Sequence, residues 1–210
     1  MRRGFRVAVL AFACVVGFVS AEEKAGSSSG FVPKDFEGWE GLIKEYWSVN
    51  KDGDLVGYTS KDPGFNTFLC SKKEYKDFEM SFKVRLKDGV GNSGIQIRSK
   101  LANEKKFAVH GPQADIGAGY WGSLYGEGFG GMMKAASKES QEAIKAKDFN
   151  DYSIKCVGKK VTIKINGVTT VDEEFAKMPE EGIIAFQLHA GYPSMEVTFK
   201  DLKFKDLSAK

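Results

Sequence analysis

The sequence lacks the features that mark membrane, zinc-binding and nucleic-acid-binding proteins. Its apolar run from Val7 to Val19 is about 13 residues, whereas a helix that crosses a bilayer needs about 20. The three cysteines form no CxxC pair and no cluster with histidine, so no zinc site is indicated. Basic residues number 31 and acidic residues 28, and three arginines lie in the first 21 residues, which leaves 28 of each sign beyond them. A neutral remainder excludes a basic nucleic-acid binder.

The first 21 residues have the composition of a secretory signal. A basic start precedes the apolar run, and Val19-Ser20-Ala21 suits a signal peptidase, so we expect cleavage after Ala21. A membrane anchor is disfavoured by the short run, and a lipoprotein at Cys14 is disfavoured because Ala11-Phe12-Ala13 does not fit a lipobox. We therefore expect a secreted or periplasmic protein that is not bound to a membrane once the signal has been removed. Residues 22–30 are predicted to form a flexible polar linker.

Apolar residues almost nowhere recur with the 3.6-residue period of an α-helix, which argues against a helical protein. Instead, apolar and polar residues alternate in short runs between turn residues, as is typical of β-strands. The clearest predicted strands are Phe78 to Leu86, Tyr152 to Val157, Val161 to Ile165, Val168 to Val171, Ile183 to His189 and Met195 to Phe204. Roughly a dozen strands exceed one small sheet, so we predict a single all-β domain over 31–207, a jelly-roll β-sandwich of two antiparallel sheets with little helix. The main exception is Ser137 to Lys147, predicted to be a short surface helix or a mobile loop.

The glycine-rich segment from Gly117 to Gly131 contains a formal GxGxxG sequence. A dinucleotide-binding fingerprint needs a strand before it and a helix after it, but Ser123-Leu124-Tyr125-Gly126 follows here. We expect a loop or strand rim beside a cleft, with no helix starting at Gly122.

Polar residues alternate with apolar ones on three predicted strands, and they differ from ordinary surface residues. The usual solvent-facing residues of a strand are Lys, Glu, Thr and Ser, whereas these strands offer amides, a carboxylate, a guanidinium and an imidazole. Such planar hydrogen-bonding groups suit sugar hydroxyls. A polar network that merely orders the sheet is the alternative for each residue alone. Together they predict that one face of a sheet is lined by Gln96, Arg98, Gln113, Asp115, Gln187 and His189.

Two further sets of residues complete the candidate inventory. Tyr120, Trp121 and Tyr125 lie in the glycine-rich segment and are candidate platforms for sugar stacking. Cys70 and Cys156 either pair in an oxidising compartment or remain buried thiols, and the sequence leaves both open.

Several motifs resemble the secreted 3-keto-disaccharide hydrolase domain family, and the resemblance covers nearly the whole mature chain. The most specific motif is Gly91-Asn92-Ser93-Gly94-Ile95-Gln96-Ile97-Arg98. The matching segments also include Gly111-Pro112-Gln113-Ala114-Asp115-Ile116, Gly122-Ser123-Leu124-Tyr125-Gly126-Glu127 and Gly182-Ile183-Ile184-Ala185-Phe186-Gln187-Leu188-His189. One departure is Gly128-Phe129-Gly130-Gly131, where the matching branch commonly carries an Arg. The resemblance implies a concanavalin A-like jelly roll.

The resemblance also implies an activity, the cleavage of oxidised disaccharides or glycosides. A ketone at C3 acidifies the C2 proton, so a base could remove it, a cation or donor could stabilise the enolate, and the C1 group could leave before water adds. We expect Asp115 or His189 as the base, Arg98 as the stabiliser and Glu127 as an aid to the leaving group. The sequence leaves open that Asp115 and Glu127 are instead the acid and nucleophile of a conventional glycoside hydrolase. The substrate-binding candidates are Gln96, Gln113, Gln187, Tyr120, Trp121 and Tyr125. No cofactor is indicated, and a divalent cation stays open. The alternative is a noncatalytic, lectin-like domain that binds carbohydrate on the same face.

Overall fold

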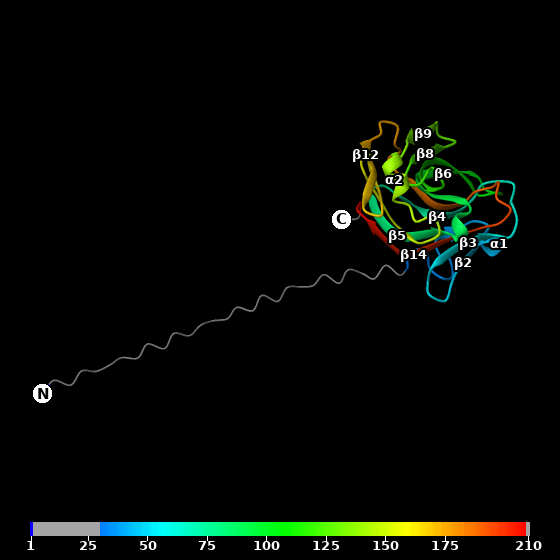
Figure 1. Ribbon diagram of the computed structural model, residues 1–210, viewed down its shortest axis with the longest axis horizontal. Helices are drawn as coiled ribbons and strands as arrows, with labels where there is room; N and C mark the ends of the chain where they lie inside the picture. Colours follow the sequence, from blue (N-terminus) through cyan, green and yellow to red (C-terminus); the bar gives the residue numbers. More distant parts are fainter. Residues whose placement is uncertain (2–29, 209–210) are drawn as a thin grey trace.

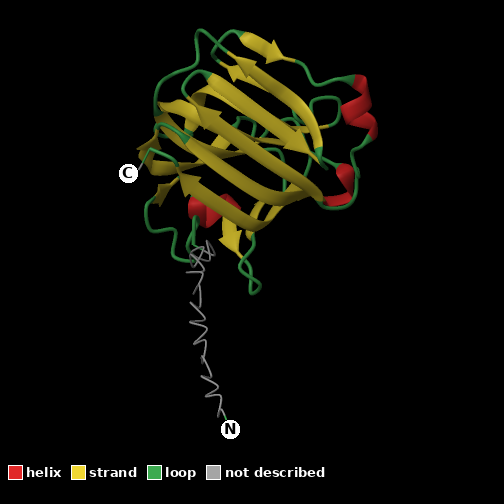
Figure 2. Ribbon diagram, turned by 90° about the vertical axis from the view of Figure 1, so that its left-hand side faces the viewer, coloured by secondary structure: helices red, strands yellow, loops and turns green. Residues whose placement is uncertain are grey.

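The protein is a sandwich of two antiparallel seven-stranded sheets (Figures 1 and 2). The computed structural model describes Met1 and residues 30–208, so the predicted signal and nearly all of the predicted linker lie outside the described residues. Among the described residues, helix is confined to peripheral turns: α1 (Ile43–Tyr46), α2 (Lys138–Glu142) and one 3₁₀ turn (Lys87–Gly89). The all-β jelly-roll prediction is confirmed.

The first sheet has the strand order β1-β4-β13-β6-β7-β8-β9. Its strands are β1 (Trp39–Glu40), β4 (Thr67–Tyr75), β13 (Gly182–Leu188), β6 (Asn92–Asn103), β7 (Ala108–Gly117), β8 (Leu124–Glu127) and β9 (Gly131–Lys134).

The second sheet has the strand order β12-β11-β10-β5-β14-β3-β2. Its strands are β12 (Val168–Glu174), β11 (Lys160–Ile165), β10 (Asn150–Val157), β5 (Phe78–Leu86), β14 (Met195–Asp206), β3 (Leu55–Thr59) and β2 (Trp47–Val49).

The main core lies between the sheets because each strand turns its apolar face inward. In β5 the alternate residues from Phe78 to Leu86 are buried, and the residues between them are more exposed. Phe82 stacks on Tyr152 at 5.2 Å between ring centroids, and Phe186 of the first sheet meets Phe199 of the second at 4.9 Å. Aromatic pairs of this kind contribute beyond the area they bury.

The predicted elements agree with the structure in kind and differ in length. The expected strand Phe78 to Leu86 has the same bounds as β5, and the other five predicted strands correspond to β10 to β14. The predicted helix is shorter than expected: Ser137 caps it by accepting a hydrogen bond from the Ser140 N–H, and the helix ends at Glu142. The segment from Gly117 to Gly131 forms a turn, β8 and the start of β9, and no helix begins within it.

The outer face of the first sheet is concave. Val109 of β7 packs in one cluster with Phe68 and Cys70 of β4, although two strands separate β4 from β7 in the sheet. Register shifts in β6, between Gln96 and Lys100 and again before Asn103, bend the β6–β7 hairpin. The hairpin therefore covers part of the sheet that it belongs to.

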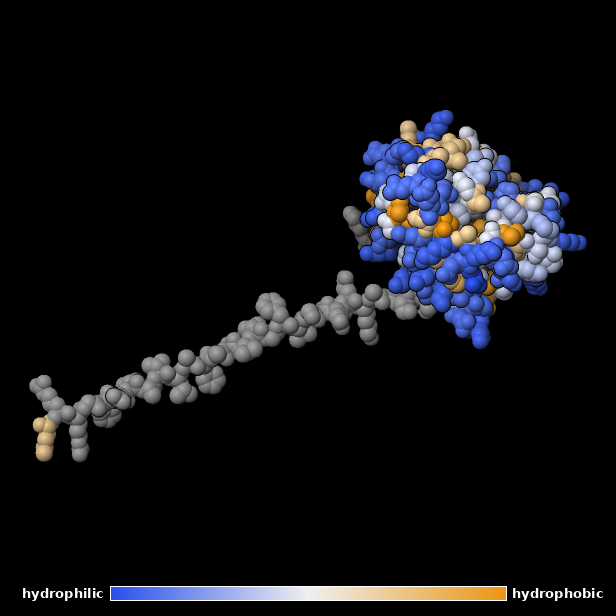
Figure 3. All heavy atoms as spheres, in the orientation of Figure 1, coloured by the Kyte–Doolittle hydropathy of each residue, from blue (hydrophilic) through white to orange (hydrophobic). Residues whose placement is uncertain are grey.

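The described surface is mainly polar. The view in Figure 3 is largely hydrophilic with scattered hydrophobic residues, and exposed large hydrophobic residues include Tyr58, Tyr120 and Met132. Within the described part of the chain, no helix is long and apolar enough to span a membrane. Cys70 and Cys156 are both buried free thiols, and burial raises the pKa of each to about 12.

Candidate functional site

Four of the predicted site residues meet on the concave outer face of the first sheet. Gln96 of β6 lies opposite Gln113 of β7, and Gly94 lies opposite Asp115, so Gln113 and Asp115 share one face of β7. Gln187 comes from β13, on the other side of β6. All four side chains are buried: Gln96 and Gln187 have no exposed surface, Gln113 keeps 2% and Asp115 keeps 5%.

Hydrogen bonds join these residues into a branched chain that starts at Ser99, and we call it the amide chain. The Ser99 hydroxyl donates to Gln96 Oε1 over 2.6 Å, and Gln96 Nε2 donates to Gln113 Oε1 over 2.9 Å. Gln113 Nε2 then donates to Asp115 Oδ1 over 2.7 Å and to Gln187 Oε1 over 3.1 Å. Gln187 Nε2 is buried and has no hydrogen-bond partner among the described residues. A buried amide donor normally has a partner, so this atom is a candidate contact for a ligand.

Two glycines make room for the amide chain. A Cβ atom on Gly94 would lie 2.6 Å from the Gln113 amide carbon, and a Cβ on Gly111 would lie 2.2 Å from Ser99 Oγ. Real Cβ atoms do not approach other atoms so closely. These glycines are therefore part of the site although they contribute no functional group.

Asp115 carries the main electrostatic feature of the site. Burial raises the pKa of this carboxyl to about 7, the hydrogen bond from Gln113 opposes the shift, and the charge of Glu127 adds to it. Its backbone is fixed on both sides, because the Asp115 N–H donates to Ser123 O and the Asp115 carbonyl accepts from the Gly122 N–H and the Tyr152 hydroxyl. A fixed carboxyl that titrates near neutral pH is suited to general acid–base catalysis.

The rim of the site is formed by half-buried residues from several elements. Glu127 of β8 accepts a hydrogen bond from Asn66 Nδ2 over 3.3 Å, and Asn66 Oδ1 accepts from the Ala190 N–H over 3.0 Å. Tyr125 lies directly opposite Gln113 in the β7–β8 pair. Asn66 thus links the loop before β4 to both the β8 edge and the loop after β13.

His189 follows β13 two residues after Gln187, and its N–H donates to Asn92 O at the start of β6. Its Nδ1 lies 2.6 Å from the Ala190 carbonyl oxygen. A carbonyl only accepts hydrogen bonds, so in the neutral ring Nδ1 carries the hydrogen and Nε2 keeps the lone pair. His189 is therefore half-buried near one end of the amide chain, with its distal nitrogen able to accept a proton.

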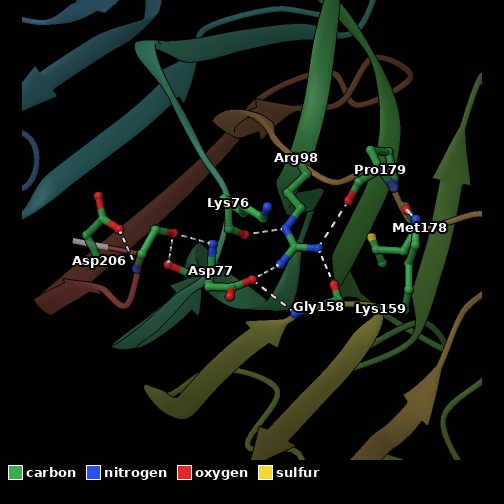
Figure 4. A network of polar contacts seen from close by, with 9 residues as sticks. Lys76, Asp77, Arg98, Gly158, Lys159, Met178, Pro179 and Asp206 are labelled. Atoms are coloured by element: carbon green, nitrogen blue, oxygen red, sulfur yellow. Dashed lines mark hydrogen bonds and ion pairs between the residues drawn. The ribbon is translucent and has the colours of Figure 1, made fainter. Parts of the chain in front are cut away.

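The structure contradicts the expectation for Arg98. Arg98 adopts a positive φ of 48° at the irregularity in β6. Figure 4 shows its side chain among Lys76, Asp77, Gly158 and Pro179, and not with the residues of the amide chain. There Nε donates to Lys76 O, Nη1 donates to Gly158 O at 2.5 Å and Pro179 O at 3.1 Å, and Nη2 pairs with Asp77 Oδ1 at 2.9 Å. The guanidinium is fully buried, so Arg98 links the two sheets and does not serve as an enolate stabiliser.

Trp121 is a second correction. It is 4% exposed and belongs to the main core between the sheets, because the tight turn after β7 turns its ring inward. It cannot act as a stacking platform for a sugar. Tyr120, its neighbour, is 47% exposed in the same turn.

A groove of about 820 Å³ lies on the second sheet, away from these residues. Its lining includes Ser81, Lys83, Ser153 and Lys164, and none of the predicted site residues. Lys83 lies 3.9 Å from Asp151 there, and both side chains are well exposed. The described residues also contain no cluster of three or more His, Cys, Asp or Glu side chains arranged to hold a metal ion.

The family model of the 3-keto-alpha-glucoside-1,2-lyase-like domain matches residues 29–205 of the chain. The chain belongs to this family. Membership confirms the resemblance seen in the sequence and indicates a carbohydrate-related function. A search of curated proteins gave no match.

Solved structures with the same fold include a candidate glycosyl hydrolase, a carbohydrate-binding module and a galectin-like protein. A candidate glycosyl hydrolase from Parabacteroides distasonis has 20% identity and a TM-score of 0.61, over 84% of this chain and 97% of the other. The carbohydrate-binding module CBM66 from Bacillus subtilis has 17% identity and a TM-score of 0.60, over 80% and 95%. A Bacillus subtilis protein with a galectin-like fold has 10% identity and a TM-score of 0.56, over 80% and 88%. At these identities the likeness establishes the fold alone.

Two residues of the lyase-like domain escaped sequence reasoning. Ser99 follows Arg98 in β6, and only the irregularity there brings its hydroxyl to Gln96. Asn66 lies in the loop between β3 and β4, where no periodic pattern identifies it. Its position just before a buried strand was the one available signal.

Proposed function

We propose that this protein is a secreted enzyme that cleaves 3-keto glycosides, with Asp115 as the base on the concave face of the first sheet. Family membership supports the substrate class. The proposed export rests on the signal-like composition of residues 1–21.

The proposed reaction begins with the proton on C2 of the sugar, which the neighbouring C3 ketone acidifies. Asp115 takes this proton, and the electron pair left on carbon is delocalised onto the ketone oxygen as an enolate. The enolate then expels the C1 oxygen substituent, which leaves as an alcohol once it has gained a proton. Water adds to the resulting double bond and gives the free 3-keto sugar. A positioned general base typically contributes about 10²- to 10⁴-fold to such a step.

The observation that carries the proposal is the buried Asp115 carboxyl, whose pKa is raised to about 7, within a hydrogen-bonded amide chain. Gln187 Nε2, which has no partner among the described residues, is the proposed donor to the ketone oxygen. With Arg98 bound at the end of the sandwich, this neutral donor takes the role first expected of a cation. Glu127 and His189 remain candidates to protonate the leaving group.

A noncatalytic carbohydrate-binding domain is the second candidate function. The position of Arg98 favours it, because the cation expected beside an enolate is held elsewhere. Amide side chains beside Tyr125 can bind sugar hydroxyls without chemistry.

One assay separates the two candidates. We expect the protein to release nitrophenol from 3-keto nitrophenyl glucoside and not from the unoxidised glucoside. If neither glycoside is cleaved while calorimetry detects sugar binding, the binding domain is the correct description. If both are cleaved equally, the ketone has no role and the elimination mechanism is wrong.

A further inference from the structure

The hydrogen bonds of the amide chain all run in one direction. Each donor points from Ser99 through Gln96 and Gln113 towards Asp115, whose Oδ1 accepts at 2.7 Å. An ionised carboxylate can only accept hydrogen bonds. The described direction therefore fits an ionised Asp115.

The opposite direction satisfies Gln96 better, because the described orientation turns its Oε1 towards the carbonyl oxygens of Gly111 and Pro112. If the Gln96 amide is reversed, its nitrogen lies 2.6 Å from Ser99 Oγ and 3.3 Å from the carbonyl oxygens of both Gly111 and Pro112. Its oxygen then lies 2.9 Å from the position of Gln113 Oε1, which must become a nitrogen for a hydrogen bond to form. Gln113 must therefore reverse together with Gln96.

Reversal of Gln113 has a consequence at each of its two acceptors. Its carbonyl oxygen would face Asp115 Oδ1, and that contact is favourable only if Asp115 carries a proton to donate. It would also face Gln187 Oε1, so Gln187 must reverse as well. The unpartnered position on Gln187 then holds an oxygen, and the group facing a ligand changes from a donor to an acceptor.

We propose that Gln96, Gln113 and Gln187 form a reversible relay, in which a proton on Asp115 changes Gln187 from a hydrogen-bond donor to an acceptor towards a ligand. The inference rests on the proposed function only for the chemistry of that ligand. A ketone oxygen accepts hydrogen bonds and cannot donate them, whereas a hydroxyl does both. The ionised state, which the proposed reaction needs, is then the state that can bind a keto sugar, whereas in the protonated state Gln187 can bind only a hydroxyl of the parent sugar.

The surroundings of Asp115 bring its change of protonation close to neutral pH. Glu127 of β8 acts on it through its charge, and burial raises the pKa of Asp115 to about 7. Tyr152 of β10 donates its hydroxyl to the Asp115 carbonyl and stays protonated, because burial raises the pKa of its phenol far above the usual value. Burial therefore brings the titration of Asp115 to near neutral pH, while Tyr152 keeps its proton there.

The relay is testable without substrate, by nuclear magnetic resonance on the full chain. The probes are the Asp115 carboxyl carbon and the side-chain amides of the three glutamines, with the carboxyl assigned by its loss in Asp115→Asn. We expect all four signals to titrate with one midpoint. If only the Gln113 amide follows Asp115 and the Gln96 amide does not change with pH, the chain does not reverse and the proposal is overturned.

A pair of serine variants on β6 tests the direction of the effect. Ser99→Ala removes the donor that the described direction needs, while the reversed Gln96 amide keeps the Gly111 and Pro112 carbonyls, so the Asp115 midpoint should rise by about half to one pH unit. Ser93→Ala is the matched control, because the buried Ser93 hydroxyl donates to the Gln187 backbone carbonyl over 2.7 Å and is outside the chain. We expect its midpoint to match the parent. Equal midpoints in both variants would reject the relay, whether or not the protein turns over a glycoside.

Discussion

At the scale of single residues, the site depends on one carboxyl whose charge is disfavoured by its surroundings. Asp115 is nearly free of solvent, and one neutral amide hydrogen bond only partly offsets the cost of burial. A cation beside Asp115 would hold the pKa of its carboxyl low. Arg98, the cation that the sequence predicted there, pairs with Asp77 instead. Arg98 therefore has a structural role, and burial remains the main influence on the pKa of Asp115.

The pH dependence of stability should report this carboxyl. Its pKa in the folded protein, about 7, lies above the ordinary value of 3.8, so between these values the folded state holds a proton that the unfolded state releases. The free energy of unfolding should therefore fall as pH rises from about 4 to 7. Urea denaturation of the parent and Asp115→Asn at pH 5 and pH 8 measures the effect. The variant should lose this decrease, and equal pH slopes in the two proteins would mean that Asp115 titrates normally.

Replacement of Arg98 should affect stability and not chemistry. Arg98→Met removes hydrogen bonds to three carbonyls and an ion pair, and should cost about 3 kcal/mol or more. Arg98→Lys should also destabilise, because an ammonium cannot reproduce the planar fork. Denaturation curves give the loss, and activity per folded molecule should stay near that of the parent. A fully folded Arg98→Lys protein without activity would return Arg98 to the catalytic site.

At the scale of elements, the two-residue period of strands explains both what the sequence predicts and where it fails. Because side chains alternate along a strand, Gln113 and Asp115 could be placed on one face from sequence, and the structure brings them together with Gln96 and Gln187. The same rule misplaced Arg98, since the irregularity between Gln96 and Lys100 breaks the alternation at Arg98. Strand neighbours and loop contacts such as that of Asn66 depend on the tertiary fold, and the alternation pattern does not contain them.

The close packing of β6 against β7 gives a prediction at this scale. Gly94→Ala would bring a Cβ within 2.6 Å of the Gln113 amide, so the amide chain must shift and turnover of the 3-keto glycoside should fall at least tenfold. Gly57→Ala is the matched control, because its Cβ would lie 2.7 Å from the Trp47 ring in the second sheet. Kinetics and thermal melts on both variants provide the comparison. If both lose stability but keep equal activity per folded molecule, the position of the amide chain does not matter for catalysis.

At the scale of the whole molecule, the two sheets have different tasks. Both supply the shared core, but the first sheet also bends its β6–β7 hairpin over its own outer face and buries polar side chains there. The second sheet presents paired lysines and acids to solvent, and its Gly158 turn helps to hold Arg98. A buried polar face on one sheet of a sandwich from the 3-keto-alpha-glucoside-1,2-lyase-like family is the basis for the proposed function.

The most direct test of this proposal is the fate of the C2 proton. A 3-keto nitrophenyl glucoside deuterated at C2 is incubated with the parent protein, Asp115→Asn and the control Asp151→Asn, whose carboxylate lies exposed on the second sheet. We expect the parent and the control to remove deuterium from C2 at equal rates, faster as pH rises through about 7. Asp115→Asn should be slower by about 10²- to 10⁴-fold while remaining folded. Equal deuterium loss in all three proteins, or none in the parent, would contradict Asp115 as the base.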